Sequence, residues 1–344
     1  MTVSAVFHIH TIFSDGRANR EPLLAAARST GASIVAIVDH DTVENRTWMG
    51  WQKNCFILAG TEVTLKGDQH AVAFGLDKAP TPRVESAATL LNGLPRRAFT
   101  YIAHPYDQPC PVFGLRGYPF TEWKHQDRFH GIEVWNLVST AKGYARSFLR
   151  GAQLFKNTVL LLPYPTREVL QKWDEIAATH RYFGICGLDE HTYPIHKYWF
   201  NEEVFGLEKS FGIMRNHLLL DESVLRTSAA EDEILKCLRE GRFYFAFDGR
   251  EPADGFDFRV RTADGEFPMG AEIPFNPPVQ LRFKLPRKAG MKIFCNGVMA
   301  AFHSGEEFFV PADKPGCYRA EVYYRARPWI FSNPIWLLPP PTAK

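Results

Sequence analysis

The sequence predicts an α/β domain with a parallel sheet, followed by a smaller all-β region. Two observations predict the α/β domain: apolar strands alternate with a helix near the N-terminus, and His, Asp or Glu residues follow these strands. A change in composition predicts the second region, where short β-branched and aromatic runs predominate. The 344 residues are enough for both, and we expect one domain over residues 1–250 and another over residues 251–344.

The first elements form a βαβ unit. Residues 5–10 are strand-like, and residues 21–30 are rich in Ala and Leu with Gly31 as a stop signal, which predicts a helix. Residues 33–38 are a β-branched run without polar alternation, typical of a strand buried on both faces. Residues 55–59 are the next strand of this kind. The sequence therefore predicts a parallel sheet.

The rest of the first domain continues with strands and helices. Residues 144–179 have helical spacing that prolines interrupt at 161–165, which predicts helices joined by a loop. Residues 229–240 form a well-marked helix closed by Gly241. Further strands are expected at residues 71–74, 99–103, 131–136 and 181–187.

The C-terminal region is expected to be a small β-sandwich. Its strand-like runs, at residues 279–285, 291–295 and 318–324, are separated by Gly, Pro, Asn and Asp. Aromatic-rich β domains of this kind more often pack, cap or oligomerise than catalyse. We therefore look for the chemistry in the first domain.

Composition and charge favour a small molecule as the partner. The formal net charge is +2, and no dense run of Lys or Arg suggests a nucleic-acid or membrane surface. No apolar run approaches the roughly 20 residues of a membrane span, and His8 lies too near Met1 for a signal peptide to precede it. The six cysteines include no C-x-x-C pair, so we expect reduced thiols in a cytoplasmic protein. The oligomeric state is not determined.

The segment 6–16 contains the first cluster of metal-ligating residue types. Residues two apart on a strand point to the same face, so His8 and His10 can direct two imidazoles at one point. Asp15 follows on the loop. Such side chains are suitable metal ligands. Two histidines on a solvated strand face are an equally good interpretation of this segment alone.

Later strand ends repeat the pattern. The carboxyl ends of parallel strands meet at one edge of a sheet, where α/β barrels place their active sites. Chance is a poor explanation for so many such residues at strand ends. The further candidates are His40, Glu62, His70, His104, Asp189 and His191.

The order of these motifs resembles the PHP superfamily, the polymerase and histidinol phosphatase domain. The resemblance covers roughly the first 200 residues and implies a distorted seven-stranded β/α barrel with up to three metals at its mouth. Segments 316–321 and 327–335 also resemble the C-terminal β domain of the CehA/McbA branch of PHP metallohydrolases. The motifs are H-x-H-T-x-x-S-D-G at 8–16, D-H-D at 39–41, G-x-E at 60–62, His70, A-H-P at 103–105 and G-x-D-x-H at 187–191.

The resemblance implies two or three divalent transition-metal ions, and the mixed N and O ligands suit zinc, manganese and iron alike. Glu62 would bridge two of the ions. Some family members have His at the position of Asp15, and a carboxylate there shifts the third site toward harder metals. The implied ligands are His8, His10, Glu62 and Asp189 for the first ion, Glu62, His70 and His104 for the second, and Asp15, His40 and His191 for the third.

The complete ligand set favours an active enzyme over a domain retained for structure. We expect a metal-dependent phosphoesterase that hydrolyses a small phosphorylated substrate, with a metal-bridging hydroxide as the nucleophile. Glu62 and Asp189 would act as ligands, and His191 or a metal-bound water would protonate the leaving oxygen. Two alternatives stay open: an ester, amide or carbamate hydrolase of the carbaryl-hydrolase type, and a non-enzymatic binding module.

Weaker candidates surround this set. Arg17 follows the Ser-Asp-Gly turn and could bind an anionic substrate bidentately, or it could be a solvated loop residue. Glu133 and Asn136 could orient the metal-bound histidines, or they could simply pack at a strand end. His196 could line the mouth without being a ligand. Structural or surface roles are expected for His125, His130, His180, His217 and His303.

Overall fold

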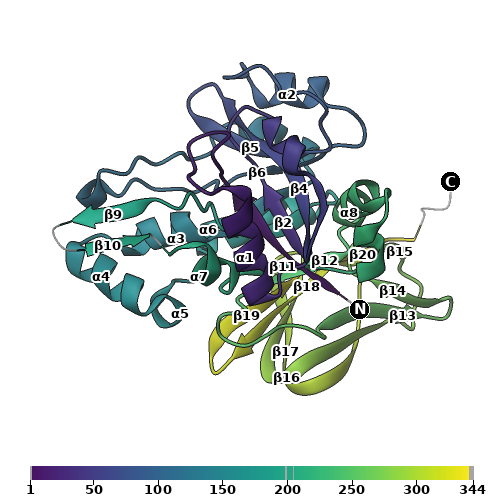
Figure 1. Cartoon of the computed structure of the whole chain (residues 1–344). Coiled ribbons are helices and arrows are strands. Elements are labelled where there is room, and N and C mark those ends of the chain that lie inside the picture. Colours follow the sequence, from purple (N-terminus) through teal and green to yellow (C-terminus); the bar gives the residue numbers. More distant parts are fainter. Residues whose placement is uncertain (1, 198–199, 204, 341–344) are drawn as a thin grey trace.

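A computed structural model describes residues 2–197, 200–203 and 205–340. The chain is mixed α/β with a large sheet, as the sequence predicts, and a β-rich part follows the helical part (Figure 1). None of the helices in these described ranges is long and apolar enough to cross a membrane. The helices are α1 (Arg20–Thr30), α2 (Ala87–Gly93), α3 (Leu137–Tyr144), α4 (Phe148–Lys156), α5 (Thr158–Leu161), α6 (Arg167–Ala177), α7 (Leu207–Phe211) and α8 (Ala230–Arg239).

The strands of the α/β part begin with the predicted βαβ unit. α1 ends at Gly31, whose φ of 73° is the left-handed conformation that glycine adopts readily. β1 pairs with β2, and β2 with β4, in parallel. The strands are β1 (Val3–Ile9), β2 (Ile34–Ile37), β3 (Gly50–Gln52), β4 (Cys55–Leu65), β5 (Gln69–Phe74), β6 (Phe99–Ile102), β7 (Gly131–Asn136), β8 (Phe183–Gly187), β9 (Pro194–Lys197), β10 (Phe200–Glu203), β11 (Arg215–Leu218) and β12 (Phe243–Ala246).

The sheet is not parallel throughout. β6, β7 and β8 are parallel neighbours, whereas β5 pairs antiparallel with both β4 and β6. The reason is the connection: only residues 66–68 separate β4 from β5, and a parallel partner would need a crossover of a dozen or more residues.

The sheet is not a closed barrel. β1 pairs with β2 on one edge and, over residues 3–5, with β11 on the other, so little of that edge remains for β8. Among the described residues the contact there consists of one bridge, between Ile9 and Glu190, and three backbone hydrogen bonds between segments 7–10 and 188–190. The distorted seven-stranded barrel therefore stays a prediction.

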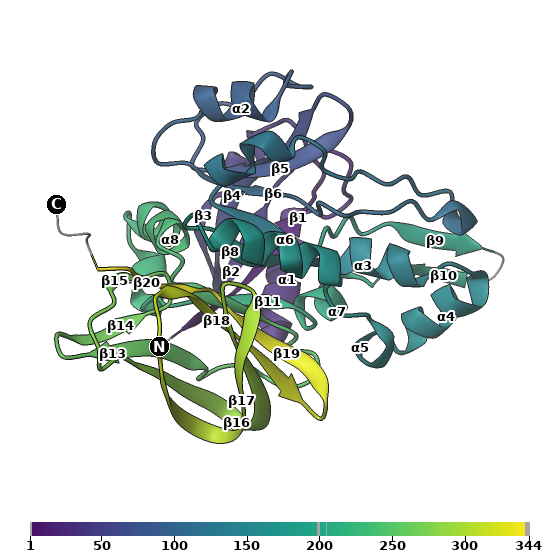
Figure 2. The ribbon, with the colours of Figure 1, turned by 180° about the vertical axis from the view of Figure 1, so that it is seen from behind.

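The C-terminal part consists of strands, as expected. The runs predicted at residues 279–285 and 291–295 belong to one long strand, β16. β19 pairs with β12, so the sheet continues from the α/β part into the β part, which lies beneath it in Figure 2. The strands are β13 (Asp257–Thr262), β14 (Gly265–Pro268), β15 (Glu272–Pro274), β16 (Gln280–Cys295), β17 (Val298–Pro311), β18 (Gly316–Tyr324), β19 (Arg327–Ser332) and β20 (Ile335–Leu338).

Two hydrophobic cores match this division in outline. One includes residues from β1 through β12, and the other lies mainly in the β part but also contains Tyr244 and Ala246 of β12. Phe331 and Trp336 of the β part nevertheless belong to the first core. All six cysteines are free and buried, in agreement with the expectation of reduced thiols.

Candidate metal centre

The end of β1 brings His8 and His10 together. The pairing of β1 with β2 shifts register between Phe7 and Ile9, so His8 is the extra residue of a β-bulge, with a φ of 67°. The two rings lie 5.2 Å apart, and both residues are fully buried. Regular strand alternation, expected from the sequence, therefore does not hold at His8, and a bulge orients its ring instead.

Several residues of this centre have strained backbone conformations. His8, His104 and Asp189 have φ values of 67°, 24° and 57°. The left-handed conformation costs a residue with a Cβ on the order of 1–2 kcal/mol. Such strain clusters at sites where an unusual backbone aims a side chain. Three of the nine predicted ligands are therefore held in conformations that packing must enforce.

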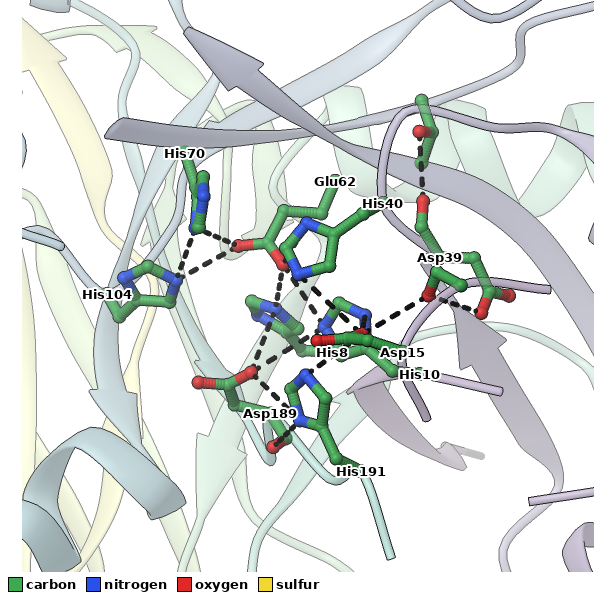
Figure 3. Close-up of polar contacts among 12 residues, drawn as sticks. His8, His10, Asp15, Asp39, His40, Glu62, His70, His104, Asp189 and His191 are labelled. Atoms are coloured by element: carbon green, nitrogen blue, oxygen red, sulfur yellow. Dashed lines mark hydrogen bonds and ion pairs between the residues drawn. The ribbon is translucent and has the colours of Figure 1, made fainter. Parts of the chain in front are cut away.

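Glu62 lies in the middle of the cluster (Figure 3). The sequence predicts that Glu62 follows the end of a strand, but β4 continues past it. β4 pairs first with β2 and then, over the part that contains Glu62, with β5. Oε2 lies 3.1 Å from Nε2 of both His8 and His10. Oε1 lies 2.9 Å from Nε2 of His104 and 3.2 Å from Nδ1 of His70. Nδ1 of His40 lies 3.6 Å from Oε2, so one buried carboxylate faces five imidazoles.

The predicted ligands form three overlapping groups. Within each group, one potential ligand atom per residue lies within 4.8 Å of all the others. The groups have the membership that the family resemblance implies, except that His10 also joins the third. They are His8, His10, Glu62 and Asp189; Glu62, His70 and His104; and His10, Asp15, His40 and His191.

The third group lies at the mouth of the cluster. Asp15 Oδ1 is 3.3 Å from Nε2 of His191, 3.7 Å from Nδ1 of His10 and 3.9 Å from Nε2 of His40. The hydroxyl of Tyr193 donates to Asp15 Oδ2 at 3.1 Å. The Asp15 side chain is 49% exposed, whereas Glu62 is buried. A substrate would therefore meet the third group first.

Glu133 orients ligands of both buried groups. Its Oε1 lies 2.9 Å from Nδ1 of His8, which leaves Nε2 of that ring facing Glu62. Its Oε2 accepts from the backbone N–H of His104 at 2.7 Å and from the side-chain amide of Asn136 at 2.9 Å. Such partners set ring orientation and tautomer at metal sites. Glu133 and Asn136 therefore do more than pack at a strand end.

The charges of the cluster are strongly coupled. Burial alone would raise the pKa of Glu62, but the surrounding imidazoles, His8 foremost, hold it well below its ordinary value. Burial alone would lower the pKa of His10, yet the carboxylates of Asp189 and Glu62 beside it raise that pKa to about 9. Burial lowers the pKa of His40 to about 4. The buried carboxylate of Glu62 is thus held in its charged form and attracts positive charge.

The donor atoms fit divalent transition-metal ions. Nε2 of His8 and both ring nitrogens of His10 are buried and have no hydrogen-bond partner among the described residues. Buried polar atoms without a partner are rare in native proteins and need an explanation. Imidazole nitrogens and carboxylate oxygens are ligands that zinc, manganese and iron accept. A bound cation would satisfy these nitrogens and balance the carboxylates.

The other sequence candidates lie around the cluster or away from it. Arg17 is exposed, and its backbone N–H donates to the carbonyl of His191 at 3.0 Å. The His196 side chain lies outside the described residues. Nδ1 of His130 bonds to Thr100, a structural role, as expected. The remaining histidines assigned to structure or surface, His125, His180, His217 and His303, also lie outside the three groups.

Sequence reasoning missed two tyrosines at the mouth. Tyr118 stacks on His70 with ring centroids 5.2 Å apart, and Tyr193 stacks on His191 at 5.0 Å. Tyr118 lies in a loop far from any motif, so no local signal marks it. Tyr193 is two residues beyond a predicted ligand, and that proximity was a usable signal.

Comparisons with known proteins find similar structures but no similar sequence. No family model matches the chain, and no curated protein matches it. A two-domain protein from Bacteroides vulgatus containing a predicted PHP-like metal-dependent phosphoesterase is 14% identical over 97% of this chain and 95% of that one, with a TM-score of 0.44. PsfC from Pseudomonas syringae is 15% identical over 69% of this chain and 96% of its own, with a TM-score of 0.39.

A third solved structure comes from Bifidobacterium adolescentis and is described as a proposed metal-dependent phosphoesterase. It is 18% identical over 54% of this chain and 87% of its own, with a TM-score of 0.34. The CehA/McbA branch stays a prediction. Two of these three structural neighbours are described as metal-dependent phosphoesterases, and one of them as PHP-like.

Proposed function

We propose that the chain is a metal-dependent phosphoesterase that hydrolyses a small phosphorylated molecule. The observation that supports this function is the sharing of ligands: Glu62 belongs to two of the three groups, and His10 also belongs to two. Ions held by such groups would be close neighbours. When bound, clustered divalent cations activate water near neutral pH and neutralise the charge that builds on a phosphoryl oxygen. We propose two or three ions of zinc, manganese or iron.

The side chains around the groups would divide the remaining work. Asp189 and the shared carboxylate of Glu62 would hold ions. His191 lies at the mouth, with a side chain 13% exposed, and could deliver a proton to the leaving oxygen. The exposed Arg17 could bind a substrate phosphate bidentately.

We also propose the finer fold assignment. β1, β2 and β4 to β8 would be the seven strands of a distorted barrel. What supports this is the set of backbone hydrogen bonds between segments 188–190 and 7–10, which lies where such a barrel would close.

The third group offers a test of the phosphoesterase function. A phosphate monoester carries close to two negative charges, whereas a neutral ester carries none and has less need of a third cation. We expect Asp15→Ala and His40→Ala to lower turnover of p-nitrophenyl phosphate by about a hundredfold or more, the scale of losing one electrostatic stabiliser. Hydrolysis of p-nitrophenyl acetate should fall much less. Both assays are run at saturating Mn²⁺ on variants shown to be folded by circular dichroism.

His180→Gln is the control, because His180 is an exposed histidine outside the three groups. Equal losses on both substrates would mean that the third group is structural or that the reaction is not phosphoryl transfer. An unchanged phosphatase rate in both variants would refute the proposed function.

A further inference from the structure

Asp39, at the end of β2, is a fully buried carboxylate whose side-chain partners among the described residues are neutral donors. Its Oδ1 accepts from the backbone N–H of Thr11 at 2.7 Å and from the Ser14 hydroxyl at 2.9 Å. Its Oδ2 accepts from the Asn45 side-chain amide at 3.0 Å. The Thr11 hydroxyl lies 3.0 Å from one oxygen and 2.9 Å from the other. A buried anion is costly unless such bonds satisfy it.

These bonds fasten the loop that carries Asp15. Thr11 and Ser14 both belong to the loop between β1 and α1. Other ties of this loop are the backbone bond from Arg17 to the His191 carbonyl, the Tyr193 bond to Asp15 and the ring contact of Phe13 with Trp48. Figure 3 shows Asp39 beside Asp15 on the side of the cluster away from His104. Asp39 therefore anchors the loop that carries Asp15 to the end of β2.

The proton of the Ser14 hydroxyl gives Asp39 a second effect on Asp15. The Ser14 hydroxyl lies 2.9 Å from Asp39 Oδ1 but also 3.4 Å from Asp15 Oδ1, the oxygen that faces His191. One hydroxyl proton forms one good hydrogen bond. While Asp39 accepts it, Asp15 Oδ1 keeps its lone pairs for a cation. Without the Asp39 acceptor, Ser14 would be free to donate to Asp15 and compete with that cation.

We propose that Asp39 is a positioning residue for the third metal group, acting through Thr11 and Ser14 and touching no ion itself. The inference rests on the proposed metal centre. It assigns a role to the first residue of the D-H-D motif at 39–41, of which only His40 was a predicted ligand.

The experiment compares Asp39→Asn with Asp41→Asn in Mn²⁺ titrations followed by calorimetry and by elemental analysis after dialysis at graded Mn²⁺. The matched control flanks His40 on its other side, and its carboxylate accepts from the backbone N–H of Thr64 at 2.8 Å. For Asp39→Asn we expect the Kd of the third ion alone to rise about 10- to 100-fold, the usual cost of losing a partner that orients a ligand. In an Asp15→Ala background the same change should have no further effect.

The outcomes separate the two claims. If the wild-type protein binds no Mn²⁺, the proposed function fails. If the wild-type protein binds three ions, the positioning role of Asp39 is wrong when Asp39→Asn binds all three equally well or loses all three alike. A wild-type protein that binds only two ions also overturns the positioning role. If Asp39→Asn does not fold, Ser14→Ala decides: weaker binding of the third ion supports the inference, and unchanged binding overturns it.

Discussion

Glu62 is the residue on which the candidate centre depends most. Its two oxygens face different sets of imidazoles, so its loss would disturb two groups at once. His70, in contrast, belongs to one group only. The two residues therefore allow a direct comparison between a shared ligand and an unshared one.

We predict that Glu62→Gln removes about two ions per chain and abolishes activity, because an amide lacks the charge that neighbouring cations require. His70→Ala should remove about one ion and leave a residual rate. Elemental analysis after reconstitution and turnover of p-nitrophenyl phosphate are the measurements. Glu85→Gln, at an exposed position paired with Lys66, serves as the control and should retain full metal content. Equal metal loss in the two site variants would contradict the shared role of Glu62.

Gly187 is required by close approach. A Cβ at this position would lie 1.7 Å from Glu133 Oε1 and 3.0 Å from Cβ of His8. We predict that Gly187→Ala displaces Glu133, so that His8 loses the partner that orients its ring and Mn²⁺ affinity falls about 10- to 100-fold. Gly143→Ala, in α3, meets no atom within 4 Å and should bind Mn²⁺ normally. Wild-type affinity in Gly187→Ala would show that Glu133 can move without cost.

At the scale of elements, α6 and β18 are joined by a buried charged cluster. Arg319 is 2% exposed and binds Asp174 of α6 through two bonds of 2.6 and 2.7 Å. It also binds Glu321 at 2.8 Å, and its guanidinium lies between the rings of Trp173 and Phe294. One arginine thus connects the α/β part with the β part.

Replacing Arg319 with Met should be strongly destabilising, because it leaves two carboxylates in a buried place without their cation. We expect a loss of about 3–5 kcal/mol in the free energy of unfolding, measured by urea denaturation. Arg83→Met removes an exposed ion pair with Asp68 and should change stability little. A loss in Arg319→Met no larger than in this control would mean that the cluster contributes no net stability.

At the scale of the whole molecule, the β part supports the α/β part through backbone contacts. The side chain of Asn333 accepts from the N–H of Gly184 in β8 at 2.8 Å and donates to the carbonyls of Gly184 and Phe243 at 3.2 and 3.0 Å. The Trp336 indole donates to the carbonyl of Ala177 at the end of α6. The boundary expected between residues 250 and 251 stays a prediction, and these contacts cross it.

A buried histidine of β11 also makes a contribution to stability that depends on pH. His217 of β11 is buried, lies 3.1 Å from Asp248 and stacks on Tyr244. Burial alone would lower the pKa of His217, but Asp248 and then Asp254 raise it to about 9, above its ordinary 6.5. A raised pKa means that the folded state binds the proton more tightly. The stabilisation is therefore complete below pH 6.5 and is lost as the pH rises through 9.

We predict that the stability difference between the wild type and His217→Gln shrinks between pH 6.5 and pH 10. Thermal unfolding across this range measures it, and His180→Gln, at an exposed site, should follow the wild type at every pH. A difference that stays constant with pH would show that His217 contributes through packing against Tyr244 rather than through its charge.

The sequence by itself determined several of the elements and the identity of the clustered side chains. The Ala- and Leu-rich composition and Gly31 predicted α1 within a residue. Short strand-like runs predicted β2, β7 and β8, and the apolar run of β2 shows the signature of a strand buried on both faces. The nine candidate ligands carried a signal in their order along the chain. The structure brings all nine into three groups.

Only the tertiary structure decided how those side chains meet. Three features depend on pairing with distant strands, which no local pattern encodes. They are the bulge at His8, the continuation of β4 past Glu62 and the antiparallel pairing of β5. Asp39 lies beside His40 in sequence, but its partners Thr11 and Ser14 come from a different loop. Tyr118 reaches His70 across almost fifty residues. A sequence records which donors and acceptors exist, and long-range packing selects the pairs that form.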